Sequence, residues 1–270
     1  MNNTMTDKRP ARLLLEDGSG FCGYAFGAET PVAGEVVFNT GMVGYPESMT
    51  DRSYRGQILV LTYPLIGNYG VPEEVLEEGL SRHFESEGIQ VLGLVVADYS
   101  FKYSHWSAKR SLEDWMIEHN IPGIYGIDTR ELTKQLREQG TLPGKIIYET
   151  DDIEFDEPHE RNLVKEVSVA EPIEYKRGDQ RVILVDCGVK NNIIRAFTRR
   201  GISVLRCPWD YDFSKEKADG LVVSNGPGDP KMCPETVENV RRAMSRNMPI
   251  LGICLGSQIL ALASGADTYK

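Results

Sequence analysis

A cysteine flanked by two glycines is the strongest chemical signal in this sequence. The segment Gly252-Ile253-Cys254-Leu255-Gly256 follows a short apolar run and precedes a helical pattern. This spacing is typical of a nucleophile elbow, a sharp turn from a strand into a helix. Glycine two residues before and two after the nucleophile removes a Cβ that would collide with neighbouring backbone. A thiolate at a helix start is also favoured by the helix dipole, so the pattern predicts a catalytic thiol at Cys254.

The alternative for a lone cysteine in an apolar stretch is that it is packed and inert. The paired glycines favour catalysis at Cys254, whereas the other cysteines lack this setting and are expected to be packed free thiols: Cys22, Cys187, Cys207 and Cys233. The five cysteines are scattered, odd in number and without a C-x-x-C pair, which fits a reducing compartment better than a disulfide scaffold.

A second segment rich in glycine and proline, SNGPGDP at 224–230, also follows an apolar run and precedes a helix starting near Pro234. Such residues often do no more than make a turn. Here, two glycines and two prolines predict a rigid turn whose N–H groups could hold an oxyanion or a carboxylate. The segment lacks the Lys-Ser/Thr of a P-loop and the G-x-G-x-x-G of a dinucleotide site, so nucleotide binding is not supported.

Both segments lie in a part of the chain where strand and helix patterns alternate. We expect strands at 181–186, 202–206, 220–224 and 249–253, and helices at 189–200, 234–247 and 257–263. This alternation predicts a doubly wound α/β domain with a parallel sheet. Ligands bind beyond the carboxyl ends of such strands, where both segments are placed.

The amino-terminal part reads as mixed strands with few helices. Residues 12–16 and 21–26 flank a DGSG turn and predict a hairpin, and further strands are expected at 35–38, 57–61 and 91–96. Ser111 with Asp114, and Asp128 with Glu131, have the spacing of helix capping boxes.

Length and charge indicate two domains. The 270 residues exceed the usual size of a single core. Residues 1–180 carry 17 basic and 31 acidic side chains, against 13 and 9 in residues 181–270. We expect domains at 1–150 and 181–270, joined by a polar connector at 151–180. The net charge of −10 disfavours a nucleic-acid partner.

Neither a secretion signal nor a membrane span is expected. The first ten residues lack an apolar stretch, and the uncharged run at 247–266 is interrupted by proline and glycines. We therefore expect a cytoplasmic protein without a membrane partner.

The pairing of SNGPGDP with GICLGSQ resembles the class I glutamine amidotransferases. In the amino-terminal half, LEDGSGFCGYAFG, GEVVFNTGMVGYPESMTDRSY, LTYPLIGNYG and IDTRELTKQLREQG resemble the small, glutamine-hydrolysing subunit of carbamoyl-phosphate synthetase. The resemblance spans nearly the whole chain. It implies a mixed α+β amino-terminal domain followed by part of a doubly wound, flavodoxin-like amidotransferase domain.

The resemblance also implies a reaction and a set of site residues. Cys254 would attack the side-chain amide of glutamine and form a glutamyl thioester with release of ammonia. The residues that match the family's glutamine-binding positions are Ser53, Gly226, Gly228, Leu255 and Gln258. A large synthetase subunit would use the ammonia with ATP and bicarbonate to make carbamoyl phosphate for pyrimidine or arginine synthesis. No cofactor or metal is expected in this chain.

The sequence departs from the family pattern in three places. Ser257 replaces the usual histidine of GICLGHQ, and DRSY replaces DPSY. The family's His-x-Glu pair has no match, because no histidine follows Cys254; the four histidines, expected to be surface or packing residues, are His83, His105, His119 and His159. We therefore expect a truncated, nearly inactive chain with an exposed apolar sheet edge. Another class I amidotransferase, or a docking or regulatory subunit with a vestigial thiol, remains an alternative.

Overall fold

The computed structural model describes residues 8–148 and 152–269, and the chain divides into two compact units. The first unit comprises Met1–Thr50 and Gly56–Pro158, and the second comprises Asp51–Arg55 and His159–Lys270. The short segment Asp51–Arg55 therefore belongs to the second unit, although it interrupts the first in the sequence.

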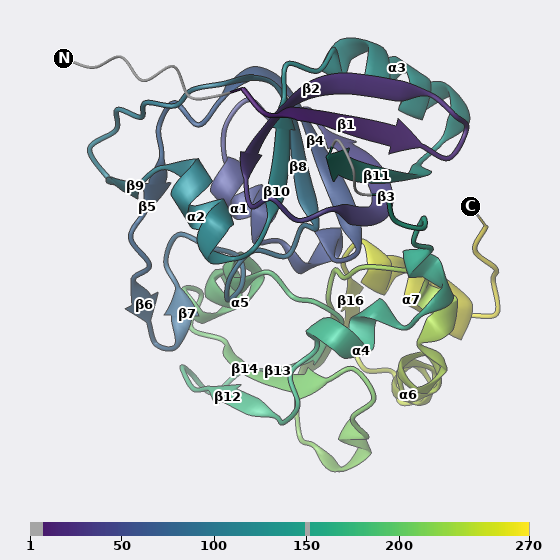
Figure 1. The fold of residues 1–270 in the computed structure, drawn as a ribbon. Coiled ribbons are helices and arrows are strands. Elements are labelled where there is room, and N and C mark those ends of the chain that lie inside the picture. The colour runs from purple at the N-terminus through teal and green to yellow at the C-terminus, as the bar shows by residue number, and fades with distance from the viewer. Residues whose placement is uncertain (1–7, 149–151, 270) are drawn as a thin grey trace. The chain divides into compact units, whose positions relative to one another are not determined.

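The first unit is built on a closed barrel with the strand order β1-β11-β3-β4-β8-β10-β2 (Figure 1). Its strands are β1 (Pro10–Leu15), β2 (Gly20–Gly27), β3 (Val32–Asn39), β4 (Gln57–Ile66), β8 (Gly93–Tyr99), β10 (Pro122–Tyr125) and β11 (Leu142–Tyr148). Neighbours β3/β4, β4/β8 and β8/β10 are parallel, and the remaining pairs are antiparallel. The mixed strands predicted from the sequence are present, and their closure into a barrel is an additional finding.

The barrel interior follows from alternation along its strands. In β1, the side chains of Ala11, Leu13 and Leu15 are buried while their neighbours are more exposed. They pack with apolar residues of the other strands, among them Val36 and Ile58, as expected when successive side chains point to opposite faces.

Two helices of the first unit begin as their capping patterns predict. In α2 (Leu112–Glu118), the Ser111 hydroxyl accepts the N–H of Asp114 at 3.0 Å. In α3 (Thr129–Gln139), the Asp128 carboxylate accepts the N–H of Glu131 at 2.9 Å. The remaining elements of this unit are short: α1 (Tyr45–Met49), β5 (Val71–Pro72), β6 (Leu76–Glu77), β7 (Leu80–Ser81) and β9 (Ala108–Arg110).

The second unit contains a five-stranded sheet in the order β12-β14-β13-β15-β16. Its strands are β12 (Ile173–Tyr175), β13 (Arg181–Asp186), β14 (Ser203–Pro208), β15 (Gly220–Val223) and β16 (Ile250–Gly252). The pairs β13/β14, β13/β15 and β15/β16 are parallel. The predicted parallel sheet is confirmed. The carboxyl ends of β13, β15 and β16 lie side by side and form what we call the carboxyl edge of the sheet.

The sheet's helices begin and end within a few residues of their predicted bounds. They are α5 (Asn191–Thr198), α6 (Pro234–Met244) and α7 (Leu255–Ala263), with α4 (Leu163–Val167) preceding the sheet. One sheet face packs against α6 and α7 in a single apolar cluster that includes Val223, Val240 and Ile259. Short 3₁₀ turns of this unit are η1 (Arg52–Tyr54), η3 (Phe213–Lys215) and η4 (Pro230–Met232), and η2 (Pro158–Glu160) begins at the last residue of the first unit.

The stretch expected to be a connector, 151–180, is partly built into the second unit. Leu163, Val164 and Val167 of α4 are buried, and β12 pairs antiparallel with β14 at the sheet edge. The prediction of a connector missed α4 because it rested on the high charge content of the whole stretch. The apolar residues of α4 are spaced to lie on one buried face of the helix, which overall composition does not indicate.

At the opposite edge of the sheet, β16 pairs with β15 and with no second strand among the described residues. Leu251 of this strand is 51% exposed, in line with the apolar edge expected from the sequence. In the described ranges, no helix is both long and apolar enough to cross a membrane.

Candidate active site

Cys254 occupies a strained turn between β16 and α7. Its φ of 52° and ψ of −111° are adopted by few residues other than glycine, and its side chain is exposed. The strand ends at Gly252 and the helix begins at Leu255. The predicted elbow is therefore present, with the thiol held outward at the strand's carboxyl end.

The two glycines of the elbow are required by close backbone contacts. A Cβ on Gly252 would lie 2.6 Å from the carbonyl oxygen of Gly256, and a Cβ on Gly256 would lie 2.1 Å from the carbonyl oxygen of Val223. Both distances are far below van der Waals contact. The structure therefore confirms that glycine is needed at both positions because a Cβ would collide with neighbouring backbone.

Hydrogen bonds hold the elbow against the neighbouring strand. Ile253 N–H donates to the carbonyl of Val223 at 2.9 Å. The Ser257 hydroxyl donates to the carbonyl of Gly252 at 2.8 Å, and the Ser257 N–H donates to the carbonyl of Cys254 at 2.8 Å. Ser257, at the position where the resembling family usually has histidine, therefore links the first turn of α7 to the end of β16 by a hydrogen bond.

The Gly226 turn, which follows β15, packs directly against the start of α7. A Cβ on Gly226 would lie 2.0 Å from the carbonyl oxygen of Cys187 and 2.9 Å from Cδ2 of Leu255. Gly228 has a φ of +78°, which glycine adopts without strain. The two glycine-rich segments singled out in the sequence therefore meet at the carboxyl edge of the sheet.

Three backbone donors at this edge have no protein acceptor within the described residues: the N–H groups of Leu255, Gly226 and Gly228. Leu255 directly follows the candidate nucleophile, and its N–H lies at the first position of a helix, where no intrahelical acceptor is available. Unpaired backbone donors beside a nucleophile can stabilise an oxyanion.

Asp186, at the end of β13, organises the third turn at this edge. It is fully buried, and its Oδ1 accepts the N–H groups of Gly188 and Val189 at 2.9 and 2.8 Å. Its Oδ2 lies 2.7 Å from the guanidinium of Arg206, which is also buried. The short distance and the burial of both side chains make this a buried ion pair. Burial lowers the pKa of Arg206, but the charge of Asp186 and its hydrogen bond outweigh this effect and raise the pKa.

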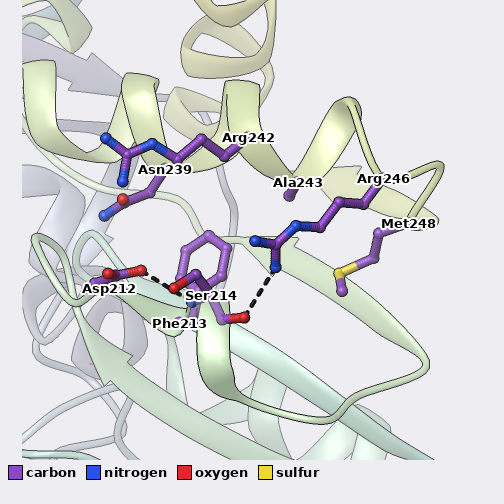
Figure 2. Close-up of a pocket in the computed structure, with 8 residues that line it drawn as sticks. All are labelled: Asp212, Phe213, Ser214, Asn239, Arg242, Ala243, Arg246 and Met248. Atoms are coloured by element: carbon purple, nitrogen blue, oxygen red, sulfur yellow. Dashed lines mark hydrogen bonds between the residues drawn. The ribbon is translucent and has the colours of Figure 1, made fainter.

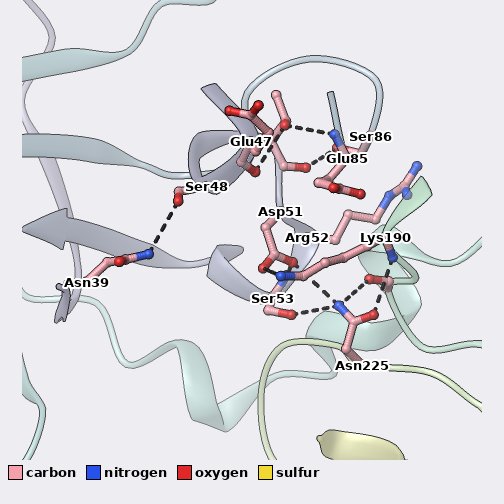
Figure 3. A network of polar contacts seen from close by, with 12 residues as sticks. Asn39, Glu47, Ser48, Asp51, Arg52, Ser53, Glu85, Ser86, Lys190 and Asn225 are labelled. Atoms are coloured by element: carbon pink, nitrogen blue, oxygen red, sulfur yellow. Dashed lines mark hydrogen bonds and ion pairs between the residues drawn. The ribbon is translucent and has the colours of Figure 1, made fainter. Parts of the chain in front are cut away.

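Ser53 is joined to the same edge by a polar network around Asn225 (Figure 3). Asn225 Nδ2 donates to Ser53 Oγ at 2.8 Å and to the carbonyl oxygen of Gly188 at 3.0 Å. Lys190 Nζ lies 2.7 Å from Oδ2 of Asp51. Ser53, the expected site residue farthest from Cys254 in the sequence, thus lies beside the segment that contains Gly226 and Gly228.

Gln258 lies in the first turns of α7, and its side chain is exposed. Its N–H donates to the carbonyl of Cys254 at 3.3 Å. Among the described residues, its side chain makes no hydrogen bond to the other expected site residues, so its glutamine-binding role stays a prediction. His159 lies in the second unit, and the other histidines lie in the first.

The packing expected of the other cysteines holds for three of them. Cys187, Cys207 and Cys233 are buried, and burial raises their thiol pKa values, to about 12 for Cys207 and Cys233. The expectation for Cys22 is wrong, because its side chain is exposed on β2. The alternation of that strand turns Cys22 away from the barrel interior, and a sequence without the barrel register does not indicate this direction.

Other concave regions of the second unit do not contain the candidate nucleophile. A small pocket between η3 and α6 holds the carboxylate of Asp212 against the Ser214 N–H at 2.9 Å, while Arg246 donates to the Ser214 carbonyl (Figure 2). A groove of about 320 Å³ lies at the amino ends of the strands, lined by residues such as Val182 and Leu251. Within the described ranges, no cluster of three or more His, Cys, Asp or Glu side chains could hold a metal ion.

Two family models match the chain. Residues 13–146 match the carbamoyl-phosphate synthase small chain, CPSase domain. Residues 183–270 match glutamine amidotransferase class-I. The first match falls on the barrel unit, and the second covers the parallel sheet and the Cys254 elbow.

Similar curated proteins are much longer than this chain. The multifunctional protein CAD of Squalus acanthias is 54% identical over 96% of the chain, and the multifunctional protein pyr-3 of Neurospora crassa is 49% identical over 96%. The human mitochondrial protein named carbamoyl-phosphate synthase [ammonia] is 47% identical over 96%. The chain spans 12%, 16% and 18% of their respective lengths.

Among solved structures, a peptidase M28 precursor from Shewanella amazonensis shares 7% identity at a TM-score of 0.28, over 95% of this chain and 70% of that one. So weak a likeness carries no argument about fold or chemistry.

Proposed function

Because the chain belongs to the carbamoyl-phosphate synthase small-chain family, with a class I glutamine amidotransferase domain after the small-chain domain, we propose that it is the nucleophile-bearing part of a protein that hydrolyses glutamine and supplies ammonia for carbamoyl phosphate synthesis, with little turnover by residues 1–270 alone. The observation that carries the proposal is the exposed, strained thiol of Cys254 beside the unpaired N–H of Leu255. A nucleophile and an oxyanion donor next to each other are what acyl transfer requires.

In the proposed reaction, the Cys254 thiolate attacks the side-chain carbonyl carbon of glutamine. A C–S bond forms, and the carbonyl electron pair moves onto oxygen, where the N–H groups of Leu255 and Gly226 stabilise it. Collapse of this intermediate breaks the C–N bond, and the nitrogen leaves as ammonia after taking up a proton. Water then cleaves the thioester, releasing glutamate and the thiol.

The substrate is held by groups around the same sheet edge in this proposal. Ser53, Gly226 and Gly228 contact glutamine on one side of the thiol, and Gln258 contacts it from α7. The network of Asn225 supports this arrangement, because it joins Ser53 to the turn that precedes Gly226.

The partner in the proposed function is a carbamoyl-phosphate synthetase part that uses ATP and bicarbonate. A synthetase within the same polypeptide is supported by the human relative, which is named a carbamoyl-phosphate synthase and of which this chain spans 18%. We propose a cytoplasmic complex or fusion that supplies pyrimidine or arginine synthesis, with no cofactor held by residues 1–270.

A second candidate function is a docking or regulatory domain whose thiol is vestigial. The observation in its favour is that a 47% identical relative is named a carbamoyl-phosphate synthase [ammonia]. That name gives ammonia, and not glutamine, as the nitrogen source. A third alternative, another class I amidotransferase, is disfavoured by the small-chain match at residues 13–146.

The test is covalent labelling of Cys254 by a diazoketone analogue of glutamine, located by peptide mass spectrometry. A Cys22→Ser background removes the other exposed thiol. We expect labelling at Cys254 that glutamine suppresses and asparagine, which is one methylene shorter, does not. Labelling that glutamine leaves unchanged would favour the vestigial thiol.

A second measurement tests turnover. Ammonia release from glutamine is compared for the chain alone, the chain with a separately expressed synthetase part of the CAD relative, and the Cys254→Ser variant with that part. The proposal requires that release with the synthetase part depend on Cys254.

A further inference from the structure

The amide of Asn225 is held in a single orientation by its partners. Its Oδ1 accepts the N–H of Lys190 at 3.3 Å, and its Nδ2 donates to the carbonyl oxygen of Gly188 at 3.0 Å. An amide turned over would place two donors against the Lys190 N–H and an acceptor against the Gly188 carbonyl. Its NH₂ group therefore points toward Ser53, whose Oγ it reaches at 2.8 Å.

This orientation decides what the Ser53 hydroxyl can do. Because its oxygen accepts a hydrogen bond from an NH₂ group, which offers no acceptor, the hydroxyl proton must point elsewhere. In the described part of the chain, this proton has no protein acceptor. Ser53 is half-buried rather than fully exposed.

The nearest carboxylate, that of Asp51, is already engaged. Its Oδ1 accepts the Ser53 N–H at 2.9 Å and lies 3.4 Å from Asn225 Nδ2. Its Oδ2 pairs with Lys190 Nζ at 2.7 Å. Asp51 is 4% exposed. Both carboxylate oxygens of Asp51 therefore already have partners, and the Ser53 proton remains available to a ligand.

We propose that Asn225 is a positioning residue that makes Ser53 a hydrogen-bond donor to an oxygen atom of the substrate. The inference rests on the proposed glutamine hydrolysis and deepens it. With one lone pair of its oxygen engaged by Asn225 and its proton directed elsewhere, the Ser53 hydroxyl is set to donate to a carboxylate or carbonyl oxygen of the ligand. Asn225 itself need not touch the ligand.

Replacing Asn225 with aspartate reverses this assignment with little change in size, but it also places an oxygen against the Gly188 carbonyl and beside the Asp51 carboxylate, so the double variant is needed to separate this repulsion from the effect on Ser53. An aspartate oxygen at the position of Nδ2 accepts the Ser53 proton, so the hydroxyl no longer donates to a ligand. Loss of one hydrogen bond to a charged group weakens binding roughly 10- to 100-fold. Asn225→Asp and Ser53→Ala should therefore have the same effect on the ligand for the same reason.

The experiment measures how strongly glutamine protects Cys254 from alkylation by iodoacetamide, in the Cys22→Ser background. Protection constants are determined for the parent chain, Asn225→Asp, Ser53→Ala and the double variant. We expect both single variants to weaken protection roughly 10- to 100-fold, and the double variant to be no weaker than Ser53→Ala. Such non-additivity identifies residues that act through one another.

Matched controls separate positioning from folding. Asn162→Asp makes the same chemical change elsewhere in the second unit, at a helix cap where the side-chain oxygen accepts the Lys165 N–H at 3.0 Å, and should leave protection unchanged. Ser53→Thr keeps the hydroxyl and should retain most of the protection. The Ser53 pair tests independently of Asn225 whether the Ser53 hydroxyl is needed, and Asn225→Ala, which removes the donor to Ser53 without adding a charge, replaces Asn225→Asp if the aspartate variant does not fold.

The outcomes distinguish the inference from the function on which it rests. If glutamine does not protect the parent chain, the proposed function and the inference both fail. If the parent chain is protected and Asn225→Asp is protected equally well, the inference alone is overturned. If Ser53→Ala is protected equally well, the inference fails together with the Ser53 contact of the proposed function. Full additivity in the double variant would show that Asn225 acts independently of Ser53.

Discussion

Gly256 lies against the carbonyl oxygen of Val223 so closely that a Cβ on it would be 2.1 Å from that oxygen. The contact is between two backbone segments, the start of α7 and the end of β15, so no side-chain rotation can relieve it. The backbone can therefore hold Cys254 at the elbow only because residue 256 is a glycine and has no Cβ.

Gly256→Ala should disrupt the elbow. The helix start must move away from β15, and overpacking of this kind typically costs about 1–3 kcal/mol of unfolding free energy. We expect a lower urea midpoint for the second unit and loss of glutamine-analogue labelling at Cys254. Gly220→Ala is the matched control, since its Cβ would meet its nearest atom at 3.3 Å. Equal behaviour of the two variants would contradict this account.

Cys254→Gly should stabilise the chain while removing the nucleophile. At φ 52° and ψ −111°, a cysteine is strained by about 1–3 kcal/mol, and glycine relieves part of this strain despite its larger entropy cost on folding. We expect a higher urea midpoint than for Cys254→Ala, which keeps the Cβ and hence the strain. A midpoint for the glycine variant at or below that of the alanine variant would argue against stored strain.

Asp186→Asn should destabilise the second unit strongly. The change leaves the buried Arg206 guanidinium without its counter-ion, and breaking a buried pair typically costs about 3–5 kcal/mol. The introduced NH₂ group can also oppose the N–H groups of Gly188 and Val189. Urea unfolding measures the loss, and a double variant with Arg206→Leu should recover part of it. No recovery would mean that the backbone bonds of Asp186 matter more than its charge.

Acid should weaken the attachment of β12 at the sheet edge. Hydrogen bonds from Arg181 hold the pKa of Glu174 below its usual 4.5. The unfolded chain therefore binds this proton more readily, so the stabilisation is complete above about pH 4.5 and is lost as pH falls through the lowered pKa. Its size is at most about 1 kcal/mol, because the pair is partly exposed.

Amide hydrogen exchange in β12, measured from pH 7 to pH 3 after correction for intrinsic rates, checks this pH dependence. Glu174→Gln should exchange faster than the parent chain at pH 7 and similarly at pH 3. Glu171→Gln, a neighbouring exposed acid, is the control. A constant difference between Glu174→Gln and the parent chain across this range would contradict the linkage.

The alternating second unit was largely predictable from the sequence because each buried strand and its helix are local patterns. Residues 181–186 were predicted as a strand and form β13, and the elbow follows from glycine spacing. The role of the glycines could be predicted because it depends on contacts between neighbouring segments of a known kind of turn.

Barrel closure and the polar network could not be predicted in the same way. Closure depends on pairings such as β1 with β11, which are far apart in the chain. Asn225 was visible in SNGPGDP, yet nothing local indicates that its amide reaches Ser53, 172 positions earlier. Asp186 is the last residue of the predicted strand 181–186, and no local pattern indicates its pairing with Arg206, which lies on a different strand.

The membership of Asp51–Arg55 in the second unit has a consequence for the modular evolution of such chains. Transplanting a contiguous stretch that begins at His159 would carry over Cys254 and Asn225 but leave Ser53 behind in its original host. Inheritance of the complete set of proposed ligand contacts would therefore require that both domains are transferred together as one gene segment.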